Sequence, residues 1–334
     1  MFWYWIVTGE TQTVLYDQFL IEVYDQAGTR LGSLGDGYSN LNAATNWKQG
    51  AVNLSAYKGQ TVELRFSAIT DGSGPTTFYI DDVSLSSVTA GNYGLAAPAN
   101  GMWWNPQESG RGFFIDRQGN QISLGAYMYE ESGSATWYTG LATLQADGTY
   151  QGALIRYAGG QTLTGSYQAP GTTQTVAQVT LLFTTGTTGT IVVEMTGGGG
   201  RNIQIQLFRA GSGPAASNAQ FNNGTWWNES ESGRGFVLEV QGNTVMLGSF
   251  MYEASGQPVW YLATGSLASA SSFTLPLVQN AGGQSLNGNY KAPAALFAPI
   301  GSVTFQATSA TTATLTLPGG RQIPLKRLVF NTGT

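Results

Sequence analysis

Two pairs of glutamates are the first residues in this sequence whose type and spacing could do chemistry. Glu108 and Glu130 belong to one stretch, and Glu231 and Glu253 take the same places in a second, similar stretch. Glycoside hydrolases use two carboxyl groups roughly 5 to 10 Å apart as general acid and as nucleophile or base. No third group that would tune them accompanies these glutamates, so we interpret them as surface or ion-paired carboxylates.

Composition removes most other catalytic devices. The 334 residues include no cysteine and no histidine, which excludes disulfides, thiolate nucleophiles, Ser-His devices and zinc sites built on Cys or His. Charged residues make up 10%, the net charge is −5, and the basic stripe that nucleic acid requires is not visible. No apolar run approaches the roughly 20 residues of a membrane-spanning helix. The sequence therefore predicts a protein that is not an enzyme and binds no nucleic acid.

The two similar stretches open on an unusual string. It reads NGMWWNPQESGRGF from residue 100 and NGTWWNESESGRGF from residue 223. Successive residues of a strand face opposite sides. Trp103 and Trp104, like Trp226 and Trp227, therefore face opposite sides: one of each pair is predicted to enter a core and the other to lie nearer solvent.

The Glu-Ser-Gly-Arg-Gly part of the string has a structural and a ligand-binding interpretation. Its two glycines supply a permissive backbone for a bulge or a tight turn. Arg111 can pair with Glu108 while it donates to loop carbonyls, and Arg234 can pair with Glu231 in the same way. We favour structural ion pairs, because a folding signature must recur in every copy, and ligand contact is the alternative.

The stretches are copies of one module. Residues 101–170 and 224–293 align without a gap, with 33 identities in 70 positions. Short alternating segments punctuated by Gly, Asn-Gly and Ser-Gly predict strands and an all-β chain. In the first copy the predicted strands are Met102–Asn105, Arg111–Arg117, Gln121–Glu130, Ala135–Leu144, Thr149–Tyr157, Thr162–Gln168, Thr175–Thr184, Thr190–Met195 and Asn202–Arg209.

Three modules follow from these segments. The first covers residues 1–89, and the two copies cover 101–210 and 223–334, with linkers at 90–100 and 211–222. Short connections favour antiparallel neighbours within each copy. We predict two homologous antiparallel meander β-barrels, because closure removes edges that a sequence with few charges protects poorly; two-sheet sandwiches are the alternative.

The repeated string resembles two known patterns. GTWWN followed by a short polar loop resembles the first strand of avidin-like barrels, in which the Asn helps to hold a ligand in the barrel mouth. This resemblance implies that Trp103 and Trp226 point inward and close one barrel end. The whole string also resembles a tandem module at the C-terminal ends of exported bacterial proteins, which implies an accessory module without catalytic residues. Aromatic faces beside amide groups suit a carbohydrate ligand. The candidate ligand-binding residues are Trp103, Trp104, Asn105, Tyr129 and Tyr138, with Trp226, Trp227, Asn228, Tyr252 and Tyr261 in the second copy.

The first module differs from the copies. Its strings FWYWIVTGE, YKGQTVELRF and TFYIDDVSL resemble the jelly-roll, galactose-binding-like domains, MAM-like in pattern, that accompany secreted bacterial proteases. Those domains carry several strands before the FWYWI strand, so the resemblance implies an incomplete jelly-roll sandwich. We expect that the chain is a fragment of a longer protein or that the upstream strands come from elsewhere.

Acidic residues of the first module also have two interpretations. Asp81 and Asp82 follow a strand, where carboxylates cap turns. Jelly rolls of this kind often bind a structural calcium ion. Glu10 and Asp71, together with Asp81 and Asp82, supply the hard oxygens that Ca²⁺ requires, so a structural calcium site is the alternative.

Low charge, an aromatic content of 12% and repeated modules favour a non-catalytic accessory or adhesion region of a secreted bacterial protein, which binds polysaccharide or another surface. The absence of cysteine is compatible with secretion, and MFWYWIVTGE does not have the form of a signal peptide. The main alternative is the subunit of an extracellular fibre. There, residues 321–334 or the linker at 86–100 would donate a strand to the first module of another chain. A glycoside-active enzyme is a third alternative.

Overall fold

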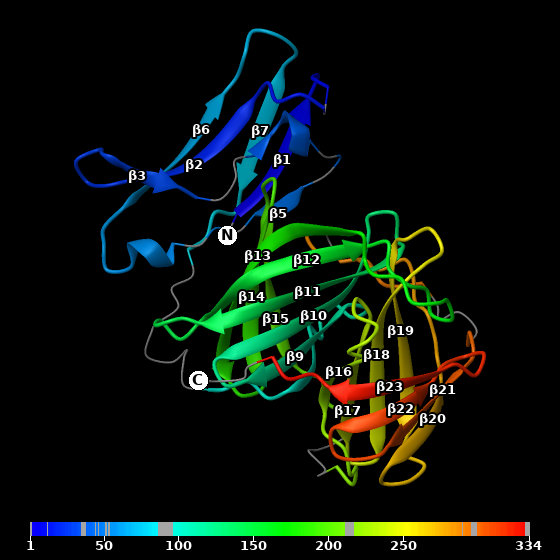
Figure 1. Ribbon diagram of the computed structural model, residues 1–334. Coiled ribbons are helices and arrows are strands. Elements are labelled where there is room, and N and C mark those ends of the chain that lie inside the picture. Colours follow the sequence, from blue (N-terminus) through cyan, green and yellow to red (C-terminus); the bar gives the residue numbers. More distant parts are fainter. Residues whose placement is uncertain are drawn as a thin grey trace.

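The computed structural model describes residues 2–11, 13–34, 38–43, 45, 47–50, 52, 54–85, 96–210, 217–288, 290–294 and 299–330. In this part the chain is all-β, as predicted, with two short 3-10 turns, η1 (Asn40–Asn42) and η2 (Ser55–Tyr57). Three units follow one another along the chain (Figure 1). Among the described residues no helix is long and apolar enough to cross a membrane.

The first unit, here called the first domain, consists of two small sheets that pack face to face. One sheet has the order β5-β1-β7, and in the other β2 pairs with β3 and β4 and with β6. The strands are β1 (Phe2–Thr8), β2 (Gln18–Tyr24), β3 (Arg30–Ser33), β4 (Tyr38–Ser39), β5 (Lys48–Gly50), β6 (Glu63–Ile69) and β7 (Thr76–Asp81). Alternation places Phe2, Tyr4 and Ile6 of β1 in the core between the sheets, so the opposite face of β1 points outward.

Strand β1 has partners on both sides within its own domain. It pairs with β5 through Tyr4 and Lys48, among other residues, and with β7 from Trp3 to Thr8. Strand β1 thus finds partners within its own domain, and the expectation that further strands come from elsewhere stays a prediction. Of the two candidate donors, residues 321–334 contain β23, which pairs on both sides within the third unit. Much of the other, residues 86–95, lies outside the described residues.

The second unit is a closed barrel. In the described residues 96–210, eight antiparallel strands follow in sequence order and the last pairs with the first. The strands are β8 (Gly101–Trp104), β9 (Gly112–Gln118), β10 (Gln121–Tyr129), β11 (Ala135–Leu144), β12 (Tyr150–Ala158), β13 (Thr172–Thr185), β14 (Thr188–Met195) and β15 (Gly200–Leu207). The meander barrel is confirmed, and the sandwich alternative is wrong for this unit.

The third unit repeats this barrel in a looser form. Its described strands are β16 (Gly224–Trp227), β17 (Gly235–Gln241), β18 (Thr244–Tyr252), β19 (Pro258–Ser266), β20 (Ser272–Pro276), β21 (Ser302–Ala307), β22 (Thr312–Thr316) and β23 (Gln322–Arg327). They form one sheet in sequence order, with β23 beside β16. Leu262 and Val278 close the ring, since each donates its backbone N–H to the other's carbonyl at 2.8 and 2.9 Å.

One predicted strand of the first repeat is wrong. The stretch Thr162–Gln168 is a connection between β12 and β13, although its residues read as a strand. It leaves its own barrel and contacts the other one, as described below. A segment can look like a strand and lie outside the sheet when its backbone groups find partners in another unit.

The tryptophan pairs divide between core and surface as predicted. Trp103 is 1% exposed, packs edge-on against Phe183 and donates its indole N–H to the carbonyl of Ala99. Trp226 is equally buried and makes the same bond to Asn222. The second tryptophan of each pair is half-buried.

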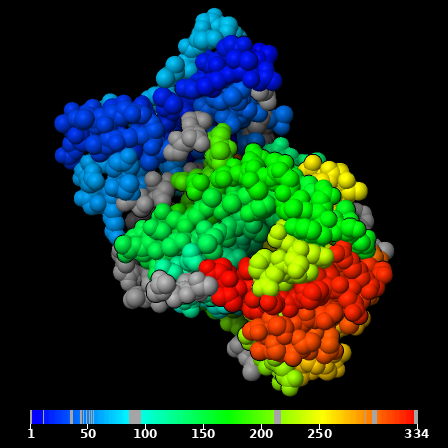
Figure 2. All heavy atoms as spheres, viewed as in Figure 1, coloured from blue at the N-terminus to red at the C-terminus, as the bar shows by residue number. Residues whose placement is uncertain are grey.

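The three units touch in chain order. In Figure 2 the first domain (blue) lies against the first barrel (green), and the second barrel (orange and red) lies on the other side. The side-chain amide of Asn42 donates to the carbonyl of Gly197, and Lys48 lies 3.7 Å from Glu131. A much larger contact joins the two barrels.

The buried member of a tryptophan pair is expected to matter far more for stability than its neighbour. Trp226→Ala should lower the free energy of unfolding by about 3–5 kcal/mol, because it leaves a large cavity beside Phe305. Trp227→Ala is the matched control and should cost much less. Thermal and urea unfolding of both variants would test this, and equal shifts would contradict the inward placement.

Candidate functional site

The Glu-Ser-Gly-Arg-Gly loop of each barrel lies at the end of the barrel that we call its mouth. In the first barrel, Glu108 accepts from the guanidinium of Arg111, three residues away, and from that of Arg201 at the start of β15. In the second barrel, Glu231 accepts from Arg234 in the same way. The ion pairs named from the sequence are therefore present in both copies, and Glu108 is occupied by two arginines.

Arg111 is buried and has partners in the other repeat. Its side chain is 3% exposed, and burial lowers the pKa of its guanidinium to about 9, which leaves it protonated at neutral pH. Nη1 donates to the carbonyl of Leu286, and the amide oxygen of Gln284 accepts from Nε at 3.0 Å. Both acceptors belong to the second repeat, about 175 positions along the chain.

These acceptors lie on a segment that each repeat extends over the mouth of the other. We call residues 158–170 the first arm and residues 281–293 the second arm; both read Ala-Gly-Gly-Gln-x-Leu-x-Gly-x-Tyr-x-Ala-Pro. Leu286 of the second arm is 2% exposed and belongs to the core of the first barrel. Leu163 of the first arm packs into the core that contains the second barrel. Each barrel therefore has its mouth closed by a leucine of its partner.

Backbone and side-chain bonds hold the arms reciprocally. Gly282 donates its N–H to the carbonyl of Gly133, and Gly159 donates to the carbonyl of Gly256, both at 2.7 Å. An arginine of each barrel donates to an arm carbonyl, Arg201 to Gly288 and Arg321 to Gly165. Tyrosine and serine hydroxyls meet at 3.3 Å in the pairs Ser109–Tyr290 and Ser232–Tyr167.

The mouth-loop glycines are needed for this contact. Gly110 has φ +99°, a conformation that side chains disfavour. A Cβ there would overlap Pro293 of the second arm, and a Cβ at Gly233 would overlap Pro170 of the first. The glycines therefore let the arm prolines approach the mouth loops, a role that the sequence alone did not indicate.

Aromatic residues fill the joint between the barrel walls. Tyr127 stacks on Phe250 with ring centroids 4.8 Å apart. The indole N–H of Trp137 donates to the carbonyl of Met251, and that of Trp260 donates to Met128, at 2.9 and 2.8 Å. The two bonds are related by the 123-residue repeat offset, so the joint has approximate two-fold symmetry.

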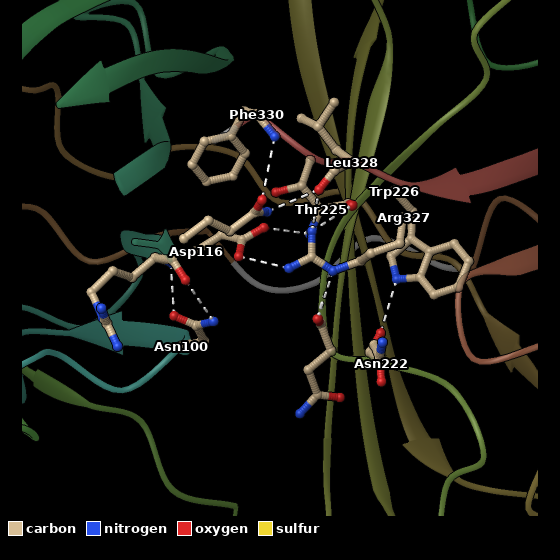
Figure 3. Close-up of polar contacts among 11 residues, drawn as sticks. Asn100, Asp116, Asn222, Thr225, Trp226, Arg327, Leu328 and Phe330 are labelled. Atoms are coloured by element: carbon tan, nitrogen blue, oxygen red, sulfur yellow. Dashed lines mark hydrogen bonds and ion pairs between the residues drawn. The ribbon is translucent and has the colours of Figure 1, made fainter. Parts of the chain in front are cut away.

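One buried acid breaks this symmetry with an ion pair. Figure 3 shows Asp116 of β9 facing Arg327 of β23. Nη2 of Arg327 donates to Asp116 at 2.7 Å, and the backbone N–H of Thr225 donates to the other carboxylate oxygen at 3.0 Å. The first repeat thus holds an acid that the second repeat neutralises.

Glu239 occupies the equivalent place in the second barrel, where its hydrogen bonds come from uncharged donors. It accepts from the backbone N–H of Met102 at 2.6 Å and from the side-chain amide of Gln241 at 2.7 Å. The residue that corresponds to Arg327 is Leu207, which brings no charge. Burial raises the pKa of Glu239 to about 7, against the opposing effect of these hydrogen bonds.

Most residues predicted to bind a ligand are enclosed by the protein. Less than a tenth of the surface of each of the following is exposed: Trp103, Trp226, Tyr129, Tyr252, Tyr138, Tyr261 and Asn228. Tyr129 and Tyr252 face the other repeat across the joint, where their rings cover Gly283 and Gly160. These seven residues are therefore enclosed by core packing or by the joint, and their role as ligand contacts stays a prediction. Trp104, Trp227 and Asn105 are half-buried.

The carboxylates read as catalytic candidates are engaged differently. Glu130 lies 3.2 Å from Arg156, which also donates to Gln257 of the other repeat. Glu108 is held by its two arginines. These contacts agree with the ion-pair interpretation.

The acids of the proposed calcium site lie in two separate places. Ser73 donates to Glu10 and contacts Asp71, both at 3.0 Å, at one end of the β1–β7 pair. Asp81 and Asp82 lie at the other end, since Asp81 pairs with Trp3 and Thr76 with Thr8. At about 3.3 Å per residue this separation is roughly 17 Å. Among the described residues no three acids are placed to hold a metal ion, so the four-residue cluster is wrong.

A group that the sequence analysis missed lies on the outer face of the first domain. Trp5 of β1 stacks on Tyr79 of β7 with ring centroids 5.5 Å apart, and Trp47 lies 6.1 Å from Trp5 and 6.3 Å from Tyr79. Tyr79 is 45% exposed, and the exposed Asp81 follows it on the same face of β7. We call Trp5, Trp47 and Tyr79 the aromatic cluster. Its signal was present in the FWYWIV string, whose alternation assigns Trp3 and Trp5 to the face opposite the core.

Comparisons of the chain with protein-family models, curated proteins and solved structures give no match.

Removal of the buried arginine is expected to weaken the joint. Arg111→Ala leaves the amide of Gln284 and the carbonyl of Leu286 without their donor, while Glu108 keeps Arg201. The free energy of unfolding is expected to fall by about 3 kcal/mol, the lower end of the range for breaking a buried ion pair. Lys326→Ala, at an exposed ion pair, is the control and should leave the melting temperature nearly unchanged. An unchanged melting temperature in both would show that the mouth loop does not need Arg111.

The joint is expected to respond to pH through Glu239. Its pKa in the folded protein, about 7, lies above the ordinary value of a glutamate, 4.5, so the folded state binds the proton more tightly. The contribution of Glu239 to the free energy of unfolding is largest below about pH 4.5, and it is lost as the pH rises through 7. Glu239→Gln should match the wild type near pH 5 and exceed its stability at pH 8 by roughly 3 kcal/mol. Melting temperatures at both pH values would test this, with the exposed Glu229→Gln as control; a difference that does not change with pH would refute it.

Proposed function

We propose that the chain is a non-catalytic accessory region of a secreted bacterial protein and that it binds polysaccharide through the aromatic cluster of the first domain. The cluster is the observation that carries the proposal. Trp5, Trp47 and Tyr79 form a partly exposed aromatic surface, and Asp81 and Thr77 beside it are exposed. Sugar rings pack their C–H faces on aromatic rings and offer hydroxyls to neighbouring carboxylates and hydroxyls.

The barrels support this proposal because their mouths and interiors are filled by side chains of the protein itself. Each mouth, the place where an avidin-like barrel would hold a ligand, contains a leucine of the partner repeat. The aromatic residues on the facing barrel walls are buried in the joint. In our proposal the barrel pair is therefore a stable base, and the first domain contacts the ligand.

The fibre alternative has less support. Strand β23, within one of its two donor segments, already pairs with β16 and β22. No specific contact among the described residues favours strand donation over glycan binding.

Retention on insoluble polysaccharides would test the proposal. The full chain is incubated with cellulose, chitin and xylan, and the bound fraction is measured after washing. Trp5→Ala and Tyr79→Ala should lose at least roughly tenfold in affinity on the polysaccharide that retains the wild type, since each removes an aromatic contact. Tyr16→Ala changes an exposed tyrosine of the same domain outside the cluster and should bind as the wild type does. Equal retention of all four proteins, or no retention of the wild type on any of these polymers, would refute the proposal.

A further inference from the structure

We propose that each barrel mouth is a sequence-specific acceptor for a peptide of the arm type, and that it takes the arm of a second copy of this chain when its own arm is withdrawn. The arm pattern is Gly-Gly-Gln-x-Leu-x-Gly-x-Tyr. This inference is independent of glycan binding, since it concerns the barrels alone.

The acceptor recognises an extended, neutral, glycine-rich peptide. In the first barrel, the backbone carbonyl of Gly133 accepts from the N–H of Gly282, the first glycine of the second arm. The buried Arg111 donates to the side-chain oxygen of Gln284. The leucine enters the barrel core, and an arginine donates to the carbonyl of the later glycine, as Arg201 does to Gly288. These contacts involve four positions of the arm pattern: the first glycine, the glutamine, the leucine and the later glycine.

The two arms differ at positions that fill no core and supply none of the arm groups described above. Thr162 and Thr164 of the first arm correspond to Ser285 and Asn287 of the second. The glycines, the glutamine, the leucine, the tyrosine and the proline are the same in both. Two different peptides therefore occupy equivalent acceptors, and both share the buried leucine and the later glycine whose carbonyl accepts from an arginine; we take these shared residues as the recognition code.

A second copy of the chain fits as the occupant because it carries both arms. The acceptor cannot distinguish an arm of its own chain from the same arm of another chain by contact. Only the higher effective concentration of the tethered arm favours the closed chain. Since the contact is reciprocal and two-fold, its intermolecular form would also close on itself and would not propagate.

One substitution can withdraw an arm and leave its acceptor intact. A Cβ at Gly283 would overlap the ring of Tyr129, so Gly283→Val is expected to unseat the second arm and open the first mouth. The matched control is Gly171→Val, at a glycine whose Cβ would meet no atom within 4 Å. It lies directly after the first arm and should leave both mouths closed.

The probe is a labelled peptide of residues 281–293, which stands for the arm of a second copy. Fluorescence anisotropy measures its binding to the full-length wild type and to both variants. We expect Gly283→Val to bind it at least roughly tenfold more tightly than the wild type or Gly171→Val, because the tethered arm no longer competes. The same peptide with Leu286→Asp should bind roughly 10- to 100-fold more weakly, since the buried leucine is lost.

Two outcomes would overturn the inference. One is a folded Gly283→Val chain, with wild-type circular dichroism, that binds the peptide no better than Gly171→Val. The other is equal binding of the parent and Leu286→Asp peptides. If Gly283→Val does not fold, Leu286→Ala in the full chain takes its place. It keeps the arm backbone and weakens its anchor, and the same comparison with Gly171→Val then decides.

Discussion

The buried guanidinium of Arg111 in the mouth of the first barrel is the constraint from which the joint between the two barrels follows. Removing a charged arginine from water is costly unless its donors are satisfied. Glu108 satisfies Arg111 only in part, and the remaining acceptors, Gln284 and Leu286, come from the other repeat. A single repeat would therefore expose an open barrel end and an arginine with unmet hydrogen bonds. The pair of repeats, not the single repeat, is the complete unit.

This requirement explains why two separated strings recur together. The Glu-Ser-Gly-Arg-Gly loop receives an arm, and the Ala-Gly-Gly-Gln segment is the arm that is given. Because each repeat must do both, both strings appear in both copies. Tandem copies on one chain are also free to diverge where two identical subunits are not. Asp116 pairs with Arg327, whereas the equivalent position to Arg327 beside Glu239 is Leu207, so the joint carries one ion-paired acid and one acid whose pKa burial raises.

The sequence was sufficient for everything that lies within one repeat. Alternation located the strands of the first barrel to within a few residues, and the repeat itself predicted two like barrels. Alternation predicted that one tryptophan of each pair is buried, and the resemblance to avidin-like barrels implied that it is Trp103 or Trp226. The contacts between repeats were not accessible in this way, because a residue that faces the partner has the same alternation as one that faces solvent. The burial of Tyr129 in the joint was therefore not predicted, and residues 162–168 were mistaken for a strand.

The same ambiguity decides where function is to be sought. On the barrel walls, aromatic side chains that face away from the core of their own barrel are buried by the other repeat, as Tyr127 and Trp137 show. In the first domain, the outward aromatics Trp5 and Tyr79 have no such cover over their full surface, since Tyr79 remains nearly half exposed. Aromatic rings grouped at the surface, with one of them exposed, mark a candidate interaction site. The burial of the barrel residues thus leads to the first domain, and it does so without reference to any relative of the chain.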